Sequence, residues 1–259
     1  MNRGINLLLL VLVYLYFPLR GSARKLPKKI NTIAVVQSAK LGDMICTTPV
    51  FHAIKKKFPD TRVLVMGTLS NREILLHSKD VDEYVVYAKS PFDMWRSWRR
   101  AKVDVACVVG PDAFSLAALY LAGVPFIVTP QMKGGKAQAE GFFYKCMRPL
   151  MCSVPHYMGS YVPREYLRVL EPLGIISEDT EKHLNFSAAA EKKIEAFFLQ
   201  QDITAGDFIV GVSPSAGNKL KNWPTERFAE VISHLISRYK AVVLIIGGSG
   251  DTKEAEATL

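Results

Sequence analysis

Short runs of aliphatic and β-branched residues alternate with amphipathic stretches from residue 31 onward. Such alternation is typical of a parallel β-sheet covered by helices. It predicts strands at Thr32 to Gln37, Arg62 to Met66, Tyr84 to Tyr87, Val103 to Val109 and Phe126 to Thr129. Between the first two, Phe51, Ile54 and Phe58 recur three and four residues apart, which indicates a helix with one buried face. The folded part therefore begins as a β-α-β unit.

The segment from Gln131 to Tyr161 breaks this rhythm. It contains four glycines, prolines within or beside it, and the basic residues Lys133 and Lys136. We interpret it as a long functional loop with a helix inside. Beyond it, the pattern predicts a helix over Glu165 to Leu173 and then a polar linker over Gly174 to Asn185.

A second β-α-β unit follows the linker. Its predicted elements are a helix at Ala188 to Gln200, a strand at Phe208 to Val212, a helix at Pro224 to Tyr239, a strand at Ala241 to Ile246 and a helix from about Thr252. Two consecutive units of this kind predict two Rossmann-like domains that face a cleft. Since the second has only two strands, we expect it to be an incomplete, truncated domain of low stability with an exposed sheet edge.

The first 29 residues form a separate segment in this interpretation. Ile5 to Phe17 is apolar apart from Asn6 and two tyrosines, and predicts an N-terminal hydrophobic helix. Because a bilayer crossing needs about 17 to 25 residues, we expect a membrane anchor that either spans or lies in the interface. Basic residues after it outnumber Arg3 before it, which predicts a location at the cytoplasmic face of the membrane. A cleaved signal peptide is the alternative, because Gly21 to Ala23 resembles a cleavage site.

The formal net charge of +9 lies largely in that first segment. Six of the 33 basic residues precede the first predicted strand, and no acidic residue occurs before Asp43. The other 27 basic residues face 24 acidic ones, a balance too even for a duplex-binding surface, so we expect no nucleic acid partner. The four cysteines form no CxxC pair, so neither a zinc finger nor a disulfide framework is predicted.

Three loops carry candidate chemistry, and the first joins the first strand to its helix. It reads SAKLGD from Ser38 to Asp43. Open α/β sheets bind ligands at this position. The helix dipole and free amides favour an ionised carboxylate there, so Asp43 can accept a proton. Capping of its own helix is the alternative role for Asp43.

Two later loops are candidates for binding a phosphorylated ligand. From Ser213 to Pro224, small residues let backbone amides approach a phosphate, and Lys221 can neutralise a departing diphosphate. An ordinary connection with solvated lysines is the alternative. From Gly247 to Asp251, glycines leave room for a nucleotide and Asp251 can accept a hydrogen bond from a ribose hydroxyl. Neither loop matches a Walker A or GxGxxG pattern.

Taken together, these segments resemble glycosyltransferase family 9, the lipopolysaccharide heptosyltransferase family, across nearly all of residues 31 to 259. The resemblance rests on SAKLGDMICTTPVFHAIKKKFPD, LEPLGI, SPSAGNKLKNWPTERFAEV and IIGGSGD in that order. It implies an α/β fold of the GT-B type. An acceptor domain over 30–175 and a partial nucleotide-sugar domain over 186–259 would follow an anchor and basic linker over 1–29. A later DSGxxH-type segment of the family is absent, and most members lack the hydrophobic amino terminus.

The resemblance implies an inverting transfer of heptose or a related sugar from a nucleotide sugar such as ADP-heptose, with Asp43 as general base. The acceptor would be a lipopolysaccharide core or another glycan or glycolipid. The implied donor-binding residues are Ser213, Ser215, Ala216, Lys221, Gly248 and Asp251. Lys40, Lys133 and Lys136 are the acceptor-binding candidates, the last two because of the charge of their long loop.

No cofactor and no metal ion are expected, because Lys221 and loop amides would stabilise the leaving group. Asp80 to Asp82 superficially matches a metal-binding DxD motif but is interpreted as a solvated acidic loop. The five histidines are scattered, and His52 is interpreted as structural. A non-catalytic, membrane-tethered nucleotide-sugar or glycan-binding protein is the main alternative function. A dinucleotide-dependent oxidoreductase is a weaker one, because GxGxxG is missing.

Overall fold

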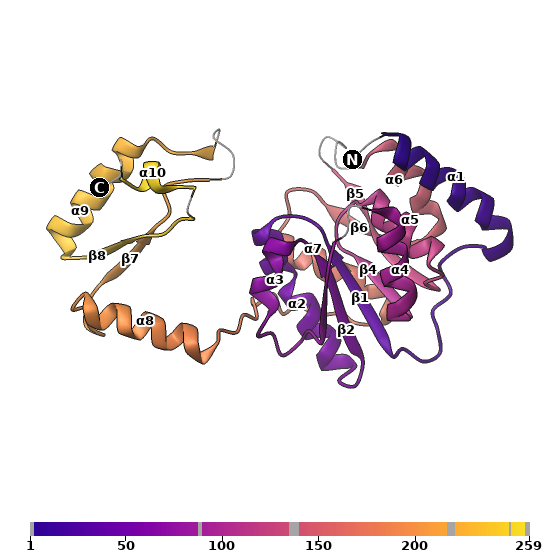
Figure 1. The fold of residues 1–259 in the computed structure, drawn as a ribbon, viewed down its shortest axis with the longest axis horizontal. Helices are drawn as coiled ribbons and strands as arrows, with labels where there is room; N and C mark the ends of the chain where they lie inside the picture. The colour runs from indigo at the N-terminus through magenta and orange to yellow at the C-terminus, as the bar shows by residue number, and fades with distance from the viewer. Residues whose placement is uncertain (1–2, 88–89, 135–139, 217–220, 249, 257–259) are drawn as a thin grey trace. The chain divides into compact units, whose positions relative to one another are not determined.

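The computed structural model describes residues 3–87, 90–134, 140–216, 221–248 and 250–256. These residues form two compact units, Met1–Phe186 and Ser187–Leu259 (Figure 1). Each unit contains a parallel β-sheet with helices packed on it. The alternation of apolar runs and amphipathic stretches therefore predicted the α/β class correctly.

The first unit is built on a six-stranded sheet in the order β3-β2-β1-β4-β5-β6, with every pairing parallel. Its strands are β1 (Thr32–Gln37), β2 (Arg62–Gly67), β3 (Glu83–Val86), β4 (Val105–Val108), β5 (Phe126–Lys133) and β6 (Cys152–Tyr157). Every residue of β1 is buried, because helices cover both faces of the sheet. The strand order reverses between β1 and β4, which is where open α/β sheets place their ligands.

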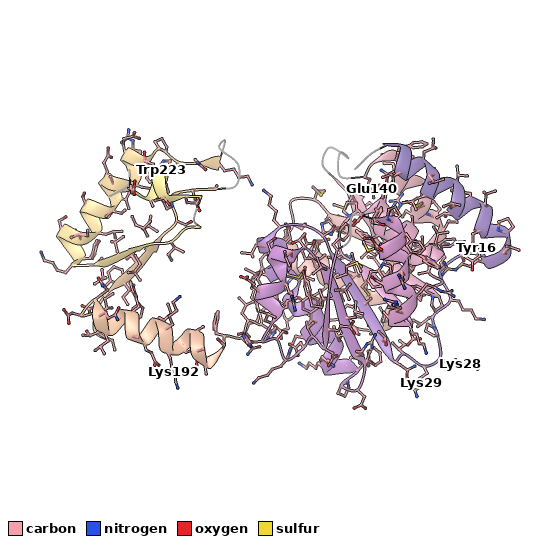
Figure 2. The ribbon with its side chains drawn as sticks, viewed as in Figure 1. Tyr16, Lys28, Lys29, Glu140, Lys192 and Trp223 are labelled. Carbon is pink, nitrogen blue, oxygen red and sulfur yellow. The ribbon has the colours of Figure 1, made fainter. Side chains whose placement is uncertain are left out.

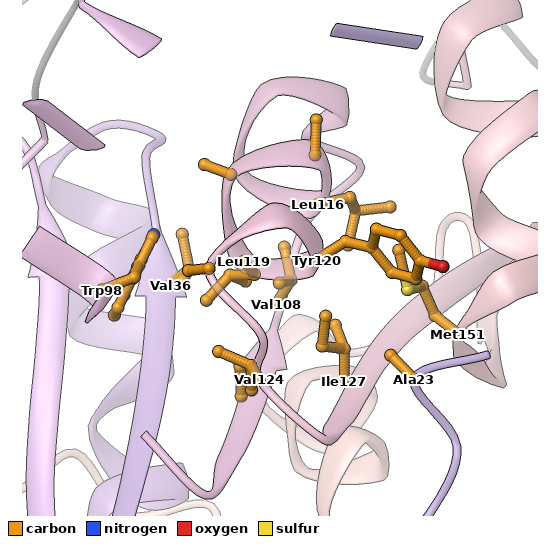
Figure 3. Close-up of a cluster of buried hydrophobic side chains, with 14 of the residues drawn as sticks. Ala23, Val36, Trp98, Val108, Leu116, Leu119, Tyr120, Val124, Ile127 and Met151 are labelled. Atoms are coloured by element: carbon orange, nitrogen blue, oxygen red, sulfur yellow. The ribbon is translucent and has the colours of Figure 1, made fainter. Parts of the chain in front are cut away.

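Two hydrophobic clusters hold helices to the two faces of this sheet. One cluster takes in α1 (Arg3–Arg20), α4 (Pro91–Ala101), α5 (Ala113–Leu121) and α6 (Phe142–Met147). The other takes in α2 (Leu41–Lys57), α3 (Leu69–Leu75), α7 (Val162–Leu167) and the 3-10 helix η3 (Arg168–Leu173). A second 3-10 helix, η2 (Arg148–Leu150), joins α6 to β6. Figure 3 shows the first cluster, in which Leu116 and Leu119 of α5 meet Val36, Val108 and Ile127 of the sheet.

Helix α1 packs on the first unit, against α5 and α6 (Figure 1). Leu9 and Val13 are buried in the first hydrophobic cluster. The hydroxyl of Tyr14 donates to the carbonyl oxygen of Cys146 at 2.8 Å. The predicted N-terminal helix is thus present, and one of its faces belongs to the core of the domain.

The end of α1 is fastened by Tyr120 of α5. Its hydroxyl donates to the carbonyl oxygen of Gly21 at 2.6 Å, and the guanidinium of Arg20 lies 4.1 Å from the centre of its ring. Among the residues that the structure describes, no helix is long and apolar enough to cross a bilayer, so the spanning anchor expected from the sequence is not supported.

The segment predicted as a long loop contains regular structure on both sides of residues 135–139. Strand β5 continues to Lys133 and pairs with β6 from Val128↔Cys152 to Lys133↔Tyr157. Helix α6 and η2 lie between the two strands. Strand β6 is at the edge of the sheet, and an edge strand can accommodate Pro155, which has no N–H to donate.

Within its described residues, the second unit has a two-stranded parallel sheet and three α-helices. Its elements are α8 (Ala188–Gln200), β7 (Ile209–Val212), α9 (Thr225–Tyr239), β8 (Val242–Ile245) and α10 (Thr252–Glu256). No residue of α8 is buried, and Ile194, Leu199 and Ile246 are more than half exposed. The second unit therefore has a much smaller hydrophobic core than the first. Because stabilisation rises with the apolar area that is buried, we expect this unit to be the less stable of the two.

The packing of α1 predicts different effects for two leucines on the same helix. Leu9 is 5% exposed and Leu15 is 69% exposed. We expect Leu9→Ala to lower the free energy of unfolding by about 2–5 kcal/mol, because it leaves a cavity in the core. Leu15→Ala should change it by less than about 0.5 kcal/mol. Urea denaturation of the whole chain, followed by tryptophan fluorescence, measures both, and equal effects would contradict the docking of α1.

Candidate functional site

The loops after β1 and β4 diverge at the switch point of the first sheet, and Asp112 connects them. Asp112 is the N-cap of α5, and its carboxylate accepts hydrogen bonds from the N–H groups of Phe114 and Ser115, both at 3.1 Å. The hydroxyls of Ser115, Tyr87 and Ser38 donate to its second oxygen at 2.9, 2.9 and 3.1 Å. One carboxylate therefore holds the start of the β1–α2 turn against the start of α5.

Two buried amide side chains fix the rest of the β1–α2 turn. Gln37 donates to the hydroxyl of Thr47 at 3.0 Å and accepts from the N–H of Ala39 at 3.1 Å. Asn71, at the start of α3, donates to the carbonyl oxygen of Ala39 at 2.9 Å. The turn is thus held from the strand before it and from both helices beside it. Such a turn gives the first residues of α2 a defined position.

Asp43 lies in the first turn of α2 and does not cap the helix. The N-cap residue is Lys40, and no side chain provides a capping hydrogen bond. The carboxylate of Asp43 is half-buried, and its Oδ1 accepts a hydrogen bond from the hydroxyl of Tyr166 at 3.0 Å. Asp43 therefore does not have the capping role considered from the sequence. Its carboxylate is not engaged in a cap hydrogen bond, so the role of proton acceptor remains open to it.

Tyr166 was not predicted from the sequence as a site residue. It lies on α7, which packs against α2, and is separated from Asp43 by 123 residues along the chain. Burial raises the pKa of the Tyr166 hydroxyl, and the nearby carboxylate of Asp43 raises it further. Tyr166 therefore stays protonated and acts as a hydrogen-bond donor at neutral pH. No local pattern in the sequence indicates such a contact.

The acceptor-binding candidates lie at the carboxyl edge of the sheet. Lys40 precedes α2 and Lys133 ends β5, and both are exposed. Lys136 lies outside the described residues. The structure adds Lys182, whose ammonium donates to the hydroxyl of Tyr161.

Lys182 also lies near the first turns of α2. Burial raises the pKa of Cys46, and the ammonium of Lys182 opposes that rise. Cys46 is three residues after Asp43 and therefore on the same side of the helix. A further cation is thus available close to the candidate base.

The donor-binding candidates of the second unit follow its two strands. Ser213 and Lys221 are exposed, and the N–H of Ala216 donates to the side chain of Asn222 at 2.9 Å. Residues 217–220 and 249 are outside the described part of the chain. The described part of the loop after β7 therefore presents exposed small and basic residues, and their role in donor binding stays a prediction.

Asp251 connects the loops after β7 and β8. Its carboxylate accepts from the N–H of Gly248 at 2.7 Å, and hydrogen bonds from Gly248 and the hydroxyl of Ser215 lower the pKa of Asp251. The structure thus brings Ser215, Gly248 and Asp251 together at the carboxyl ends of the two strands. In this arrangement Asp251 organises the loops, and its role toward a ribose remains a prediction.

The acidic loop before β3 is partly exposed, but both of its carboxylates have partners. Asp82 forms an ion pair with Lys55 at 2.6 Å and accepts from the N–H of Val63, while Asp80 contacts His52. Burial would raise the pKa of Asp82, but these hydrogen bonds lower it below its usual value. The fold also stacks His52 on His183, a contact that the scattered positions of the histidines in the sequence did not indicate.

Comparison with known proteins identifies relatives of the chain. The family model for glycosyltransferase family 9 (heptosyltransferase) matches residues 156–259. Lipopolysaccharide heptosyltransferase 3 of Escherichia coli (strain K12) is 25% identical over 223 residues, which cover 81% of this chain and 61% of that protein. The chain thus spans less than two thirds of the length of this relative.

Two solved structures share the fold. A family 9 glycosyl transferase from Veillonella parvula aligns with a TM-score of 0.73 and 20% identity. The alignment covers 88% of this chain and 66% of the Veillonella chain. ADP-heptose lipopolysaccharide heptosyltransferase II of E. coli aligns with a TM-score of 0.66 and 16% identity, covering 88% and 67%. The chain is therefore similar to glycosyltransferase family 9 over residues 156–259, resembles a lipopolysaccharide heptosyltransferase in sequence, and shares its fold with two glycosyltransferase structures.

Proposed function

We propose that this chain is the acceptor-binding and partial donor-binding region of an inverting glycosyltransferase, with Asp43 as general base. The observation that supports this most directly is the environment of Asp43. It is a half-buried carboxylate in the first turn of a helix at the switch point, held by Tyr166 and not used as a cap. The match of residues 156–259 to family 9 supports the reaction class. The two units would correspond to the two domains of a GT-B enzyme.

In the proposed reaction, Asp43 takes the proton of an acceptor hydroxyl as the oxygen attacks the anomeric carbon of the donor sugar. A new carbon–oxygen bond forms on the face opposite the diphosphate. The bond to the diphosphate breaks, and the nucleoside diphosphate leaves with the electron pair. The configuration at the anomeric carbon is inverted in this single step, so no covalent sugar–enzyme intermediate is required. Tyr166 would keep the carboxylate of Asp43 oriented during the transfer.

The second unit would bind the donor. Amides of the Ser213 to Ala216 segment and the ammonium of Lys221 would stabilise the charge that develops on the leaving diphosphate. The glycine at 248 leaves space for the nucleotide, and Asp251 holds the two loops beside it. The relatives act on ADP-heptose and lipopolysaccharide according to their names. We therefore propose a heptose or related sugar as the transferred group and a lipopolysaccharide core as the acceptor.

The acceptor would be held by the basic residues at the carboxyl edge of the first sheet. Lys40 and Lys133 are exposed there, and Lys136, three residues after Lys133 in the sequence, is a candidate outside the described residues. Phosphate or carboxylate groups on a glycolipid would be suitable partners for these side chains.

Helix α1 also presents an apolar surface toward solvent. A groove of about 690 Å³ runs between α1, α4 and α5, and it is lined mainly by aliphatic and aromatic side chains. Leu15 and Leu19 of α1 are 69% and 85% exposed, and Phe92 of α4 is 62% exposed. Exposed apolar patches of this kind are typical of interaction sites.

Exposed basic residues occur on or next to two of the helices that line this groove. Lys28 and Lys29 follow α1 (Figure 2), as does Lys25 in the sequence, and α4 carries the exposed residues Arg96 and Arg100. Apolar side chains flanked by cations are complementary to an anionic lipid surface, where the acyl region takes the former and the headgroups the latter. We therefore propose that this face rests on the cytoplasmic surface of a membrane.

The role of Asp43 is tested by Asp43→Asn. Loss of a general base should lower kcat for sugar transfer by about 10²–10⁴-fold, while binding of the donor stays within about twofold. Mass spectrometry of the acceptor, with ADP-heptose as donor, measures the transfer, and titration calorimetry measures the binding. Asp60→Asn is the matched control, because Asp60 is an exposed carboxylate in the turn after the same helix. Equal turnover of the Asp43→Asn variant and the unmodified chain would remove Asp43 from the mechanism.

The same measurements separate the enzyme from the alternative of a non-catalytic binder. If the unmodified chain binds ADP-heptose but transfers sugar to no acceptor, the binding function is favoured and the proposed reaction fails for this chain.

The contribution of Tyr166 is tested by Tyr166→Phe, which removes only the hydroxyl. A hydrogen bond to a charged group contributes about 1.5–3 kcal/mol, so kcat should fall by roughly tenfold or more. The KM for the donor should be unchanged, because Tyr166 belongs to the first unit. If kcat stays the same, Tyr166 does not orient the base.

The lipid surface is tested by flotation with vesicles of phosphatidylglycerol and phosphatidylcholine. The chain should bind the anionic vesicles and lose binding as salt concentration rises. Leu15→Gln combined with Phe92→Gln should reduce the bound fraction at least about tenfold, because both side chains would leave the acyl region. Ile176→Gln, at a position that is 87% exposed elsewhere in the first unit, is the control. No binding to either vesicle, or binding unaffected by the double substitution, would contradict the proposal.

A further inference from the structure

Three side chains of the kinds that bind transition metals meet on α2, away from Asp43. They are His52 of α2, Asp80 in the turn before β3 and His183 in the segment after η3. The Nδ1 of His52 lies 3.1 Å from Oδ2 of Asp80, and the rings of His52 and His183 stack with their centres 3.9 Å apart. One ligand atom from each residue lies within 4.8 Å of the other two. His52 is nine positions after Asp43 on α2, which places it about 13 Å further along the helix axis.

His183 has a polar atom that the fold does not satisfy. Its Nε2 is shielded from solvent and has no hydrogen-bond partner within the part of the chain that the structure describes. The backbone N–H of the same residue donates to the hydroxyl of Thr48 at 3.0 Å, which fixes its position beside α2. A buried polar atom without a partner costs about 1–3 kcal/mol, so its retention calls for an explanation. A bound cation would provide one.

We propose that His52, Asp80 and His183 form a binding site for a divalent cation of the late first transition row, with Zn²⁺ as the best match. Two imidazole nitrogens and one carboxylate oxygen are a ligand set that Zn²⁺ accepts, with water as the fourth ligand. Bonds of about 2.0–2.2 Å in a tetrahedron place ligand atoms about 3.4 Å apart. The His52–Asp80 pair already has that spacing. The two rings must turn from their stacked position so that their lone pairs converge.

A cavity of about 300 Å³ adjoins the three residues and leaves room for this rotation. Its other charged lining residues are Lys79, Glu181 and Lys182. With Asp80 included, two ammonium groups face two carboxylates, so the lining has no net charge to repel a cation. The ammonium of Lys182 is also occupied by the hydroxyl of Tyr161.

The proposed site would fasten the segment that leads to the second unit. His183 lies three residues before Phe186, the last residue of the first unit. A cation shared by His52 and His183 would join this segment to α2, the helix that carries Asp43. Its role would therefore be structural, in contrast to a cation that takes part in sugar transfer.

Titration of the whole chain with Zn²⁺, and with Co²⁺ as a spectroscopic substitute, tests the site. We expect one equivalent to bind, with the intense visible absorption of tetrahedral Co²⁺. His183→Ala and His52→Ala should each weaken binding at least about tenfold, since even the loss of a residue behind a metal ligand costs 10–100-fold. His77→Ala is the matched control, because His77 is exposed in the same connection between α3 and β3 as Asp80. Absence of binding, or equal affinity in all variants, would overturn the proposal.

Asp80→Asn provides a second test that preserves side-chain shape. Zn²⁺ should raise the melting temperature of the unmodified chain and of His77→Ala, because it binds the folded state. Zn²⁺ should raise the melting temperature of the Asp80→Asn variant much less. An equal rise in all three would place the bound metal elsewhere and refute the site. Neither measurement needs a sugar substrate, so its outcome is independent of the proposed transferase activity.

Discussion

The carboxylate of Asp112 accepts five hydrogen bonds: one from Ser38 in the loop after β1, one from Tyr87 after β3 and three from the first turn of α5. Without it, the hydroxyls of Ser38 and Tyr87 would lose their partner and α5 would lose its cap. Burial raises the pKa of Tyr87, and the charge of Asp112 raises it further, so the tyrosine remains a donor. This one carboxylate fixes where the β1–α2 turn begins, and therefore where Asp43 enters its helix. The geometry of the candidate base is thus a property of the first unit alone.

Helix α2 connects the features that matter for function. Asp43 lies in its first turn, Thr48 near its middle and His52 toward its end. Thr48 accepts from the backbone of His183, and His52 stacks on the ring of the same residue. Helix α2 therefore contacts α7 through Asp43, and it contacts the end of the first unit, at His183, through its later turns. Helix α2 thus connects the candidate base Asp43 with the segment at His183, after which the chain continues to the second unit.

The sequence predicted best where one physical cause acts over consecutive residues. Strand β1 was predicted to the residue, because a strand buried on both faces is a continuous apolar run. Strand β6 was missed, because it is an edge strand that contains a proline and only one buried residue, Val154. For α1, apolarity predicted the helix but not which of its faces would be covered. The position of Asp43 was predictable from its turn, whereas its contact with Tyr166 joins residues 123 apart and depends on the packing of α7 on α2.

The sheet of the second unit has one further consequence. As described, it contains only β7 and β8, and each of them pairs on one side alone. Each strand therefore turns a row of amide and carbonyl groups outward, and a strand from any source can add to either border by backbone hydrogen bonds that require no particular side chains. Both borders of the sheet as described can therefore accept further strands.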